Sequence, residues 1–345
     1  MDWHAERLEL PLEDAFTISR GTTETAENVL VRLERDGIEG VGAAAPSAHY
    51  GETAETVEAV LPALFEATRS VGDPHRTAEI ERRTREAVAD NPAARAAVSI
   101  AVHDWVCKDL DLPLYRYWGL SPREAVDTSF TIGIDDTDRM VEKADRAVDR
   151  GHAILKVKLG TDPDRDLDVV ARIREVAPGA RIRVDANEAW TPTEAIRNCQ
   201  ALATHDVEFV EQPVPATNRD AQRRVHERSP LPIAADESLV TAADVPQITD
   251  RADIANLKLM KCGGLREARR IVAAARASGL AVMAGCMVET GAAIAAGAQM
   301  APLLDYADLD GSLLLAEDPF QSPVRADGRI DLSDRPGTGA VAVDR

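Results

Sequence analysis

Short apolar runs alternate with longer amphipathic stretches along the chain from about residue 129 onward. The stretches between the runs, such as residues 137–151 and 265–279, carry apolar side chains at helical spacing and close on a glycine. Eight strand-like runs that alternate with helices predict an α/β fold whose parallel sheet closes into a TIM-like (β/α)8 barrel. The runs are residues 129–134, 153–159, 181–186, 207–212, 232–237, 254–259, 280–285 and 306–311.

The first 120 or so residues follow a different pattern. Residues 3–10 and 28–44 alternate between apolar and polar positions, which predicts two antiparallel strands joined through a polar loop. Residues 93–110 have the periodicity of an amphipathic helix, so a separate α+β capping domain is expected. The predicted domains are residues 1–120 (capping domain), 121–314 (catalytic barrel) and 315–345 (a tail rich in Pro, Asp and Gly that rejoins the cap).

The composition excludes several classes of partner. A chain of 345 residues with 45% hydrophobic and 29% charged residues can bury the cores of one large and one smaller domain. A net charge of −19 would repel nucleic acids and anionic membranes, so we expect a small-molecule substrate. Only 6 of the 40 basic residues are lysines, and an acidic, lysine-poor surface is typical of proteins that work in high salt.

The cysteines and the apolar segments indicate a cytoplasmic protein. The four cysteines are far apart and show no CxxC spacing, which argues against a zinc site or a disulfide framework. The N-terminal segment has no basic region followed by an apolar stretch, so no secretory signal is expected. Residues 279–304 are apolar, but Glu289 and many small residues fit a buried strand and a packed helix better than a membrane span.

Five polar side chains mark the ends of successive predicted strands. They lie 22 to 27 positions apart, close to the length of one βα unit, so the fold carries them around one rim of the barrel. The C-terminal rim is where such barrels build their active sites. The five residues are Lys158, Asp185, Glu211, Asp236 and Lys258.

Three of these five residues are carboxylates, which we predict to be metal ligands. Asp185, Glu211 and Asp236 would repel one another at a shared rim unless a positive group lay between them. Ligands that offer only oxygen favour a hard divalent cation, and Mg²⁺ is expected because it keeps water or substrate oxygens in its shell. The other interpretation is that each is an ordinary strand-end carboxylate or helix cap.

The lysines at this rim are candidates for acid/base catalysis. Lys156 and Lys158 are two residues apart in an apolar strand, so both side chains should face the barrel mouth. Like charge and desolvation favour a neutral amine, so a lysine there can act as a general base, whereas arginine keeps its proton. Lys258, four strands away, would approach the same substrate from the opposite side and permit inversion of a carbon. Lys261 leaves the strand alternation, so we expect a structural or loop contact.

Taken in order, these residues resemble the enolase superfamily, in its muconate-lactonizing-enzyme-like subgroup. The resemblance spans nearly the whole chain and implies a capping domain on a modified (β/α)8 barrel, with one Mg²⁺ and an enediolate intermediate held by the metal. It assigns the metal to Asp185, Glu211 and Asp236, and proton transfer to Lys158 and Lys258. The matching motifs are "KVK" (156–158), "VDAN" (184–187), "VEQP" (210–213), "ADES" (235–238) and "NLKLMKCGG" (256–264).

Within the superfamily, the last strand is similar to that of the dipeptide epimerases. In "DLDG", Asp308 and Asp310 share one face by strand alternation, and the resemblance implies that such a pair binds the substrate's free ammonium. "TIG", which contains Thr131, and "GCMVET" are similar to that family too, so Thr131 and Lys156 are further substrate-binding candidates. The resemblance also implies that cap loops 17–25 and 46–53 cover the site and that Arg20 contacts the substrate. For Asp308 and Asp310 the alternative is a turn or helix cap, and for Arg20 it is a surface position.

The sequence therefore predicts an isomerase that inverts the α-carbon of the C-terminal residue of a dipeptide. The resemblance implies a homo-oligomer with one Mg²⁺ per subunit. The main alternative is another activity of the same subgroup, an N-acylamino acid racemase, an o-succinylbenzoate synthase or a cycloisomerase. A metal-binding scaffold without catalysis is the alternative from a different class, but such a scaffold would have no need for both Lys158 and Lys258.

Overall fold

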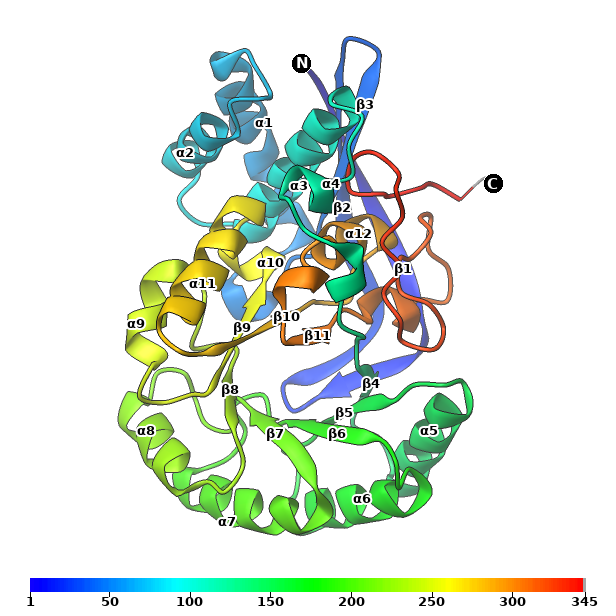
Figure 1. Cartoon of the computed structure of the whole chain (residues 1–345), viewed down its shortest axis with the longest axis vertical. Coiled ribbons are helices and arrows are strands. Elements are labelled where there is room, and N and C mark those ends of the chain that lie inside the picture. The colour runs from blue at the N-terminus through cyan, green and yellow to red at the C-terminus, as the bar shows by residue number, and fades with distance from the viewer. Residues whose placement is uncertain (344–345) are drawn as a thin grey trace.

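Eight parallel strands form a ring in the lower part of the molecule (Figure 1). The structure is a computed structural model, and it describes residues 1–343. A parallel bridge from Thr128 to Ala307 joins the first and last strands and closes the ring, which confirms the predicted barrel. The strands are β4 (Phe130–Ile132), β5 (Ile154–Lys158), β6 (Arg181–Asp185), β7 (Val207–Glu211), β8 (Ile233–Ala235), β9 (Ile254–Lys258), β10 (Ala281–Gly285) and β11 (Tyr306–Asp308).

Helices surround the ring, and the last strand departs from the repeating pattern. Only a short 3₁₀ helix, Gly311–Leu314, follows β11, so the eighth βα unit lacks a full helix. Within the described residues no helix is both long and apolar enough to cross a membrane, and the apolar segment 279–304 forms β10 and α12. The barrel helices are α5 (Thr137–Asp149), α6 (Pro163–Val176), α7 (Pro192–Leu202), α8 (Arg219–Arg228), α9 (Val245–Ile248), α10 (Leu259–Cys262), α11 (Leu265–Ala277) and α12 (Gly291–Ala298).

Large side chains fill the interior of the barrel below the rim. Phe209, Ala234, Ile254 and Met283 pack together there as a buried cluster. The guanidinium of Arg183 lies 5.3 Å from the ring of Phe209 and donates a hydrogen bond of 2.7 Å to Glu208, so its buried charge is paired. The interior is therefore packed, and ligands have access only at the rim.

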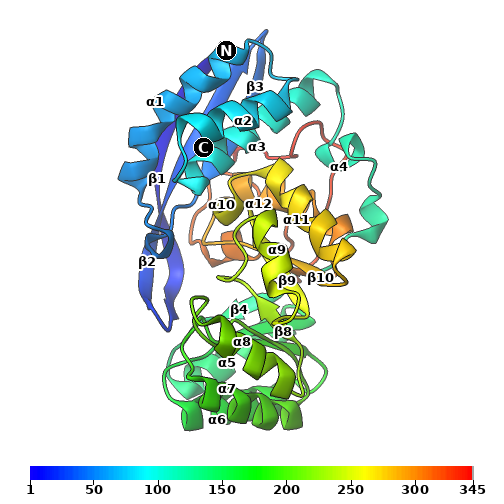
Figure 2. The same cartoon turned by 90° about the vertical axis from the view of Figure 1, so that its left-hand side faces the viewer.

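The capping domain has three antiparallel strands where the sequence pattern predicted two. The run of residues 28–44 is a hairpin, because Asp36 and Gly37 both have positive φ (54° and 78°) and reverse the chain in two residues. The preceding hairpin also extends further than expected, so the predicted polar loop is mostly strand, and Figure 2 shows it reaching down beside the barrel. The elements are β1 (Asp2–Ile18), β2 (Gly21–Arg35), β3 (Ile38–Ala44), α1 (Ala54–Val71), α2 (Thr77–Ala87), α3 (Pro92–Asp109) and α4 (Leu114–Tyr117).

Helix α3 is buried on nearly all sides, so the prediction of an amphipathic helix was wrong. It lies between the capping sheet and the short barrel helix α10, which leaves it almost no solvent face. Strand β3 approaches it closely at two glycines: a Cβ at Gly40 or Gly42 would come within 2.2 Å of a backbone oxygen of α3. A helix enclosed on all sides needs small or apolar residues all round, and the alanines of α3 satisfy this.

The C-terminal tail packs against α3. Thr338 donates from its backbone N–H and its hydroxyl to Asp104 of α3, at 2.7 and 3.0 Å. The carbonyl of Gly337 accepts from Leu114 N at 2.8 Å, and Leu315 forms a bridge with Leu12 of β1. The last two residues of the predicted tail, 344–345, lie outside the described residues.

Candidate active site

The strand register places the predicted site residues side by side. Lys158 pairs with Asp185, and Asp185 pairs with Glu211, each as the last residue of its strand. Lys258 ends β9 in the same way, and Asp236 directly follows β8. All five side chains are buried at the C-terminal rim, where the fold brings them together as the spacing predicted.

Lys156 connects three acidic side chains at the centre of this rim. Its Nζ lies 3.1 Å from Asp185 Oδ2, 2.8 Å from Glu211 Oε2 and 2.6 Å from Asp308 Oδ2. Burial alone would lower the pKa of Lys156, but these three carboxylates together raise it well above its ordinary value. Lys156 is therefore held by three carboxylates, which suits the binding role predicted for it.

Two further lysines hold Asp236. Lys258 Nζ lies 2.8 Å from Asp236 Oδ2, and Lys261 Nζ contacts Asp236 Oδ1 and donates to its backbone carbonyl at 2.6 Å. Burial would raise the pKa of Asp236, but the two ammonium groups hold it well below the ordinary range. Lys261 is thus fully buried against a predicted metal ligand, so of the two contacts expected from the sequence, structural or loop, the structure shows a structural one.

Two of the carboxylates beside Lys156, Asp185 and Glu211, differ in how easily they ionise. Burial opposes ionisation of Asp185, yet Lys158, 2.6 Å away, and Lys156 keep its pKa below the ordinary range. Burial, together with the charge of Asp185, raises the pKa of Glu211 to about 8. Of these two carboxylates, Glu211 is therefore the one whose charge the protein stabilises less.

The donor set at this rim fits a hard divalent cation. Glu211 Oε2 lies 2.8 Å from Lys156 Nζ but accepts no hydrogen bond, and Asn256 Oδ1 is also buried without a partner. Buried oxygens are normally paired, so these two atoms are available as ligands or hydrogen-bond acceptors. An oxygen-rich group of this kind, with acceptor atoms that lack a hydrogen bond, matches the ligand preference of Mg²⁺.

The predicted ammonium-binding pair lies beside β4. Asp308 accepts from Ser129 Oγ at 2.7 Å and contacts Lys156, whereas Asp310 accepts from Thr131 N at 2.6 Å and Thr131 Oγ1 at 3.1 Å. Burial and the charge of Asp308 raise the pKa of Asp310 to about 7. Strand β11 ends at Asp308, so the first turn of the following 3₁₀ helix, rather than strand alternation, positions Asp310.

Arg20 reaches the rim from the cap, but two acidic residues bind it there. Its Nη2 lies 2.7 Å from Glu237 Oε1 and its Nη1 lies 3.3 Å from Glu188 Oε2. His49, Glu188 and Glu237 also bring possible ligand atoms within 4.8 Å of one another, a group that differs from the predicted metal ligands. The sequence analysis assigned none of these three, although Glu237 lies in "ADES" next to Asp236 and Glu188 directly follows "VDAN".

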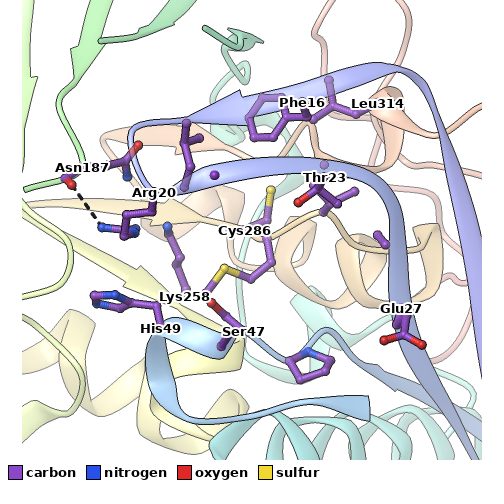
Figure 3. Close-up of a pocket in the computed structure, with 18 of the residues that line it drawn as sticks. Phe16, Arg20, Thr23, Glu27, Ser47, His49, Asn187, Lys258, Cys286 and Leu314 are labelled. Atoms are coloured by element: carbon purple, nitrogen blue, oxygen red, sulfur yellow. Dashed lines mark hydrogen bonds between the residues drawn. The ribbon is translucent and has the colours of Figure 1, made fainter. Parts of the chain in front are cut away.

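A cavity of about 680 Å³ lies between the cap and the rim. Both predicted cap segments, 17–25 and 46–53, contribute to its lining, as do Lys158, Lys258 and Asp310. Figure 3 shows Lys258 beside Arg20 and His49 at one end of the view, with Phe16 and Leu314 at the other. The barrel thus supplies the charged floor of the cavity, and the cap covers most of the remainder.

One cap residue near the cavity predicts a pH effect on stability. Glu52 is buried and accepts from Ala93 N, at the start of α3, at 3.0 and 3.3 Å. Burial, only partly opposed by this N–H, raises the pKa of Glu52 from 4.5 to about 7. A raised carboxyl pKa stabilises the fold fully below pH 4.5, and this contribution disappears as the pH rises through 7.

We expect the unfolding temperature of the wild type to fall between pH 5 and pH 8. The variant Glu52→Gln keeps an acceptor for Ala93 but cannot ionise, so its decline over the same range should be smaller by about 2 °C. Differential scanning calorimetry at several pH values measures the unfolding temperatures of the wild type and the variant. Equal slopes for the two proteins would show that Glu52 does not titrate in this range.

Family models match both parts of the chain. The model described as "Mandelate racemase / muconate lactonizing enzyme, N-terminal domain" matches residues 5–119, and the model described as "Enolase C-terminal domain-like" matches residues 139–344. The chain belongs to the enolase superfamily. The resemblance found in its sequence motifs is thereby confirmed.

Named relatives of this superfamily member are epimerases. The chain is 38% identical over 336 residues to the L-Ala-D/L-Glu epimerase of Bacteroides thetaiotaomicron, covering 97% of this chain and 86% of the relative. It is 39% identical over 329 residues to the hydrophobic dipeptide epimerase of Roseobacter litoralis, covering 94% of each. Among solved structures, a dipeptide epimerase from Enterococcus faecalis V583, complexed with Mg and L-Leu-L-Tyr, aligns with a TM-score of 0.92 at 33% identity, covering 98% of each chain.

Proposed function

We propose that this enolase-superfamily protein is a Mg²⁺-dependent dipeptide epimerase that inverts the α-carbon of the C-terminal residue. The observation that carries the proposal is the placement of Lys158 and Lys258, which line the same cavity from strands β5 and β9 on either side of the buried carboxylates. Relatives that cover nearly the whole chain have dipeptide epimerase names, which supports the same substrate class.

Asp185, Glu211 and Asp236 would hold the magnesium ion. Their oxygens suit a hard cation, and the unpaired Oε2 of Glu211 gives it a direct ligand. The ion supplies Lewis-acid stabilisation of the negative charge that develops on the substrate carboxylate as the α-proton leaves. Lys156 adds a permanent positive charge beside two of these carboxylates and limits their mutual repulsion.

Lys158 and Lys258 would exchange the α-proton on opposite faces of the substrate. One neutral amine removes the proton to give an enediolate, and the ammonium on the other side delivers a proton to the opposite face. Each lysine is oriented by its own carboxylate, Lys158 by Asp185 at 2.6 Å and Lys258 by Asp236 at 2.8 Å. This orientation keeps both Nζ atoms at the floor of the cavity, where the α-carbon would lie.

Asp310 would bind the free ammonium of the dipeptide. Asp308 is already paired with Lys156, whereas Asp310 accepts hydrogen bonds from Thr131 and forms no ion pair with any of the residues that the structure describes. A carboxylate whose pKa is raised to about 7 by burial and a neighbouring charge becomes more acidic when an ammonium binds beside it. Thr131 acts as the residue that positions Asp310.

Proton NMR in D₂O tests the proposal directly. With Mg²⁺ and a panel of L,L-dipeptides, we expect loss of the α-proton signal of the C-terminal residue and appearance of the L,D diastereomer. Added salt should be varied, because the acidic surface predicts salt dependence. Exchange of N-acylamino acids with no exchange of any dipeptide would instead support the N-acylamino acid racemase alternative.

The variant Asp310→Asn distinguishes dipeptide epimerase activity from the alternative activities of the same subgroup, whose substrates lack a free ammonium. Loss of one carboxylate from the ammonium site should raise KM for a dipeptide by about 10- to 100-fold, the cost of an unpaired charge at a partly buried site. An N-acetylated dipeptide, which lacks the ammonium, should be a poor substrate and should show little further loss in the variant. Equal effects on both substrates would argue against an ammonium-binding role for Asp310.

A further inference from the structure

The cavity above the rim has a surface that the proton-transfer mechanism does not use. This inference rests on the proposed function, in which the α-carbon of the C-terminal residue lies between Lys158 and Lys258. The substrate carboxylate then faces the three predicted metal ligands, and the peptide nitrogen points toward Asp310. The one remaining substituent, the side chain of that residue, must extend into the cavity beneath the cap.

Most of the cap residues that this side chain would meet are uncharged. Among the cap residues of the cavity, Glu27 lies 3.4 Å from Arg7, and Glu52 accepts from Ala93 N, so both acidic groups are already engaged. Figure 3 shows Thr23 on the same side of the cavity as Phe16 and Leu314. We define the upper wall of the cavity as Phe16, Ile18, Thr22, Thr23, Tyr50 and Leu314.

The one arginine that lines the cavity is committed to other partners. Arg20 binds Glu237 at 2.7 Å and Glu188 at 3.3 Å, and it also donates to the backbone carbonyl of Asn187 at 3.2 Å. Figure 3 shows Arg20 beside Asn187 and His49, at the opposite end of the view from Leu314. Its guanidinium therefore faces the barrel loops, and an incoming carboxylate would have to displace an acidic side chain to reach it.

The local backbone fixes Glu188 in this position. Asn187 and Glu188 both have positive φ (43° and 69°), a conformation that is costly for residues other than glycine. The second carboxylate oxygen of Glu188 accepts from Ala216 N at 2.6 Å, in the loop after β7. The contact between Glu188 and Arg20 is thus built into the fold rather than being a chance meeting of surface side chains.

The charges around Arg20 leave no surplus positive charge for a substrate. With Glu237 ionised, Arg20, Glu188 and Glu237 sum to −1, and with Glu237 protonated they sum to zero. His49 lies 3.6 Å from Glu188, and burial together with the charge of Arg20 lowers its pKa, which keeps the imidazole neutral. Whether Glu237 is ionised or protonated, an acidic substrate side chain would therefore meet a neutral or negative surface.

We propose that the site discriminates against dipeptides whose C-terminal side chain is acidic and favours an uncharged side chain over an acidic one. The ion pairs with Glu188 and Glu237 make Arg20 a positioning residue, which holds the cap against the barrel rim. This revises the substrate contact expected for Arg20. Selectivity for the C-terminal side chain then arises from the uncharged upper wall. Thr23 is the position on that wall where an added cation would change this selectivity.

The experiment compares L-Ala-L-Leu with L-Ala-L-Glu as substrates of the Mg²⁺-loaded enzyme. For the wild type we expect kcat/KM to favour L-Ala-L-Leu by about 10-fold or more. In Thr23→Lys the ratio should shift toward L-Ala-L-Glu by about 10-fold, because an unpaired ammonium on the upper wall attracts the acidic side chain. Thr23→Gln is the matched control: it adds length without charge and should leave the ratio near the wild-type value.

The possible outcomes separate this inference from the proposed function. A wild type that prefers L-Ala-L-Glu, or a Thr23→Lys variant whose ratio stays at that of Thr23→Gln, would overturn the inference while leaving the epimerase activity established. Failure of the wild type to exchange the α-proton of any dipeptide would overturn the proposed function itself. Circular dichroism spectra that match the wild type would exclude misfolding as the cause of a changed ratio.

Discussion

Replacing Lys158 by methionine is expected to abolish epimerisation while leaving exchange of one diastereomer with solvent. The remaining base, Lys258, still faces the α-carbon from its own side, so it can remove and return a proton there. Inversion needs both lysines, and loss of one acid/base group should lower the rate of epimerisation by about 10³-fold. Lys258→Met should show the complementary pattern, with exchange of the other diastereomer only.

The measurement is proton NMR in D₂O on each diastereomer of one dipeptide, begun from pure material. Lys143→Met provides a matched control, because Lys143 pairs with Asp135 at 3.2 Å and does not line the active-site cavity. Its rates should equal those of the wild type. If both diastereomers still exchange in Lys158→Met, proton transfer by the two lysines on opposite faces is wrong.

Replacing Glu211 by glutamine is expected to remove most magnesium binding and to stabilise the metal-free fold. Glutamine keeps the shape but carries no charge, which removes the two effects that raise the pKa of Glu211 to about 8: burial of the charge and repulsion from Asp185. Loss of a direct ligand should weaken Mg²⁺ binding by more than the roughly 10- to 100-fold cost of losing an outer-shell partner. The unfolding temperature of the metal-free variant should rise by about 2 °C or more at pH 8.

Thermal unfolding with and without Mg²⁺ measures both effects. The wild type should gain stability as Mg²⁺ is added, since a ligand that binds only the folded state stabilises it, and the variant should gain almost none. Glu227→Gln, at an exposed position of α8, serves as the control and should respond to Mg²⁺ as the wild type does. An unchanged Mg²⁺ response in Glu211→Gln would exclude Glu211 as a ligand.

Local periodicity was sufficient to find the barrel and the residues at its rim. A strand exposes every second side chain to one face, so a lysine or carboxylate at the end of an apolar run had to lie at the rim. The spacing of 22 to 27 residues then placed Lys158, Asp185, Glu211, Asp236 and Lys258 together, and the strand register agrees.

Contacts between distant segments were not predictable in the same way. Arg20 and Glu237 are 217 positions apart, and nothing in the local pattern around Arg20 shows that an acidic residue would bind it. Lys261 lies in the short helix after β9, where the chain turns back over the rim, so strand alternation could not place its ammonium on Asp236. Such contacts depend on how the cap and the loops dock, which sequence periodicity does not encode.

The packing of the tail against α3 affects when the capping domain is completed during synthesis. Asp104 and Thr338 are 234 positions apart, and the carbonyl of Thr338 also accepts from Gln299 at 2.8 Å. Domains generally fold in order as a chain leaves the ribosome. Asp104 has Val41 N and Lys108 as partners within the cap, but its contact with Thr338 forms only after the tail has been translated. Docking of the tail on the cap is therefore the last step of assembly, and nascent chains that contain the whole barrel still lack the contact between Asp104 and Thr338.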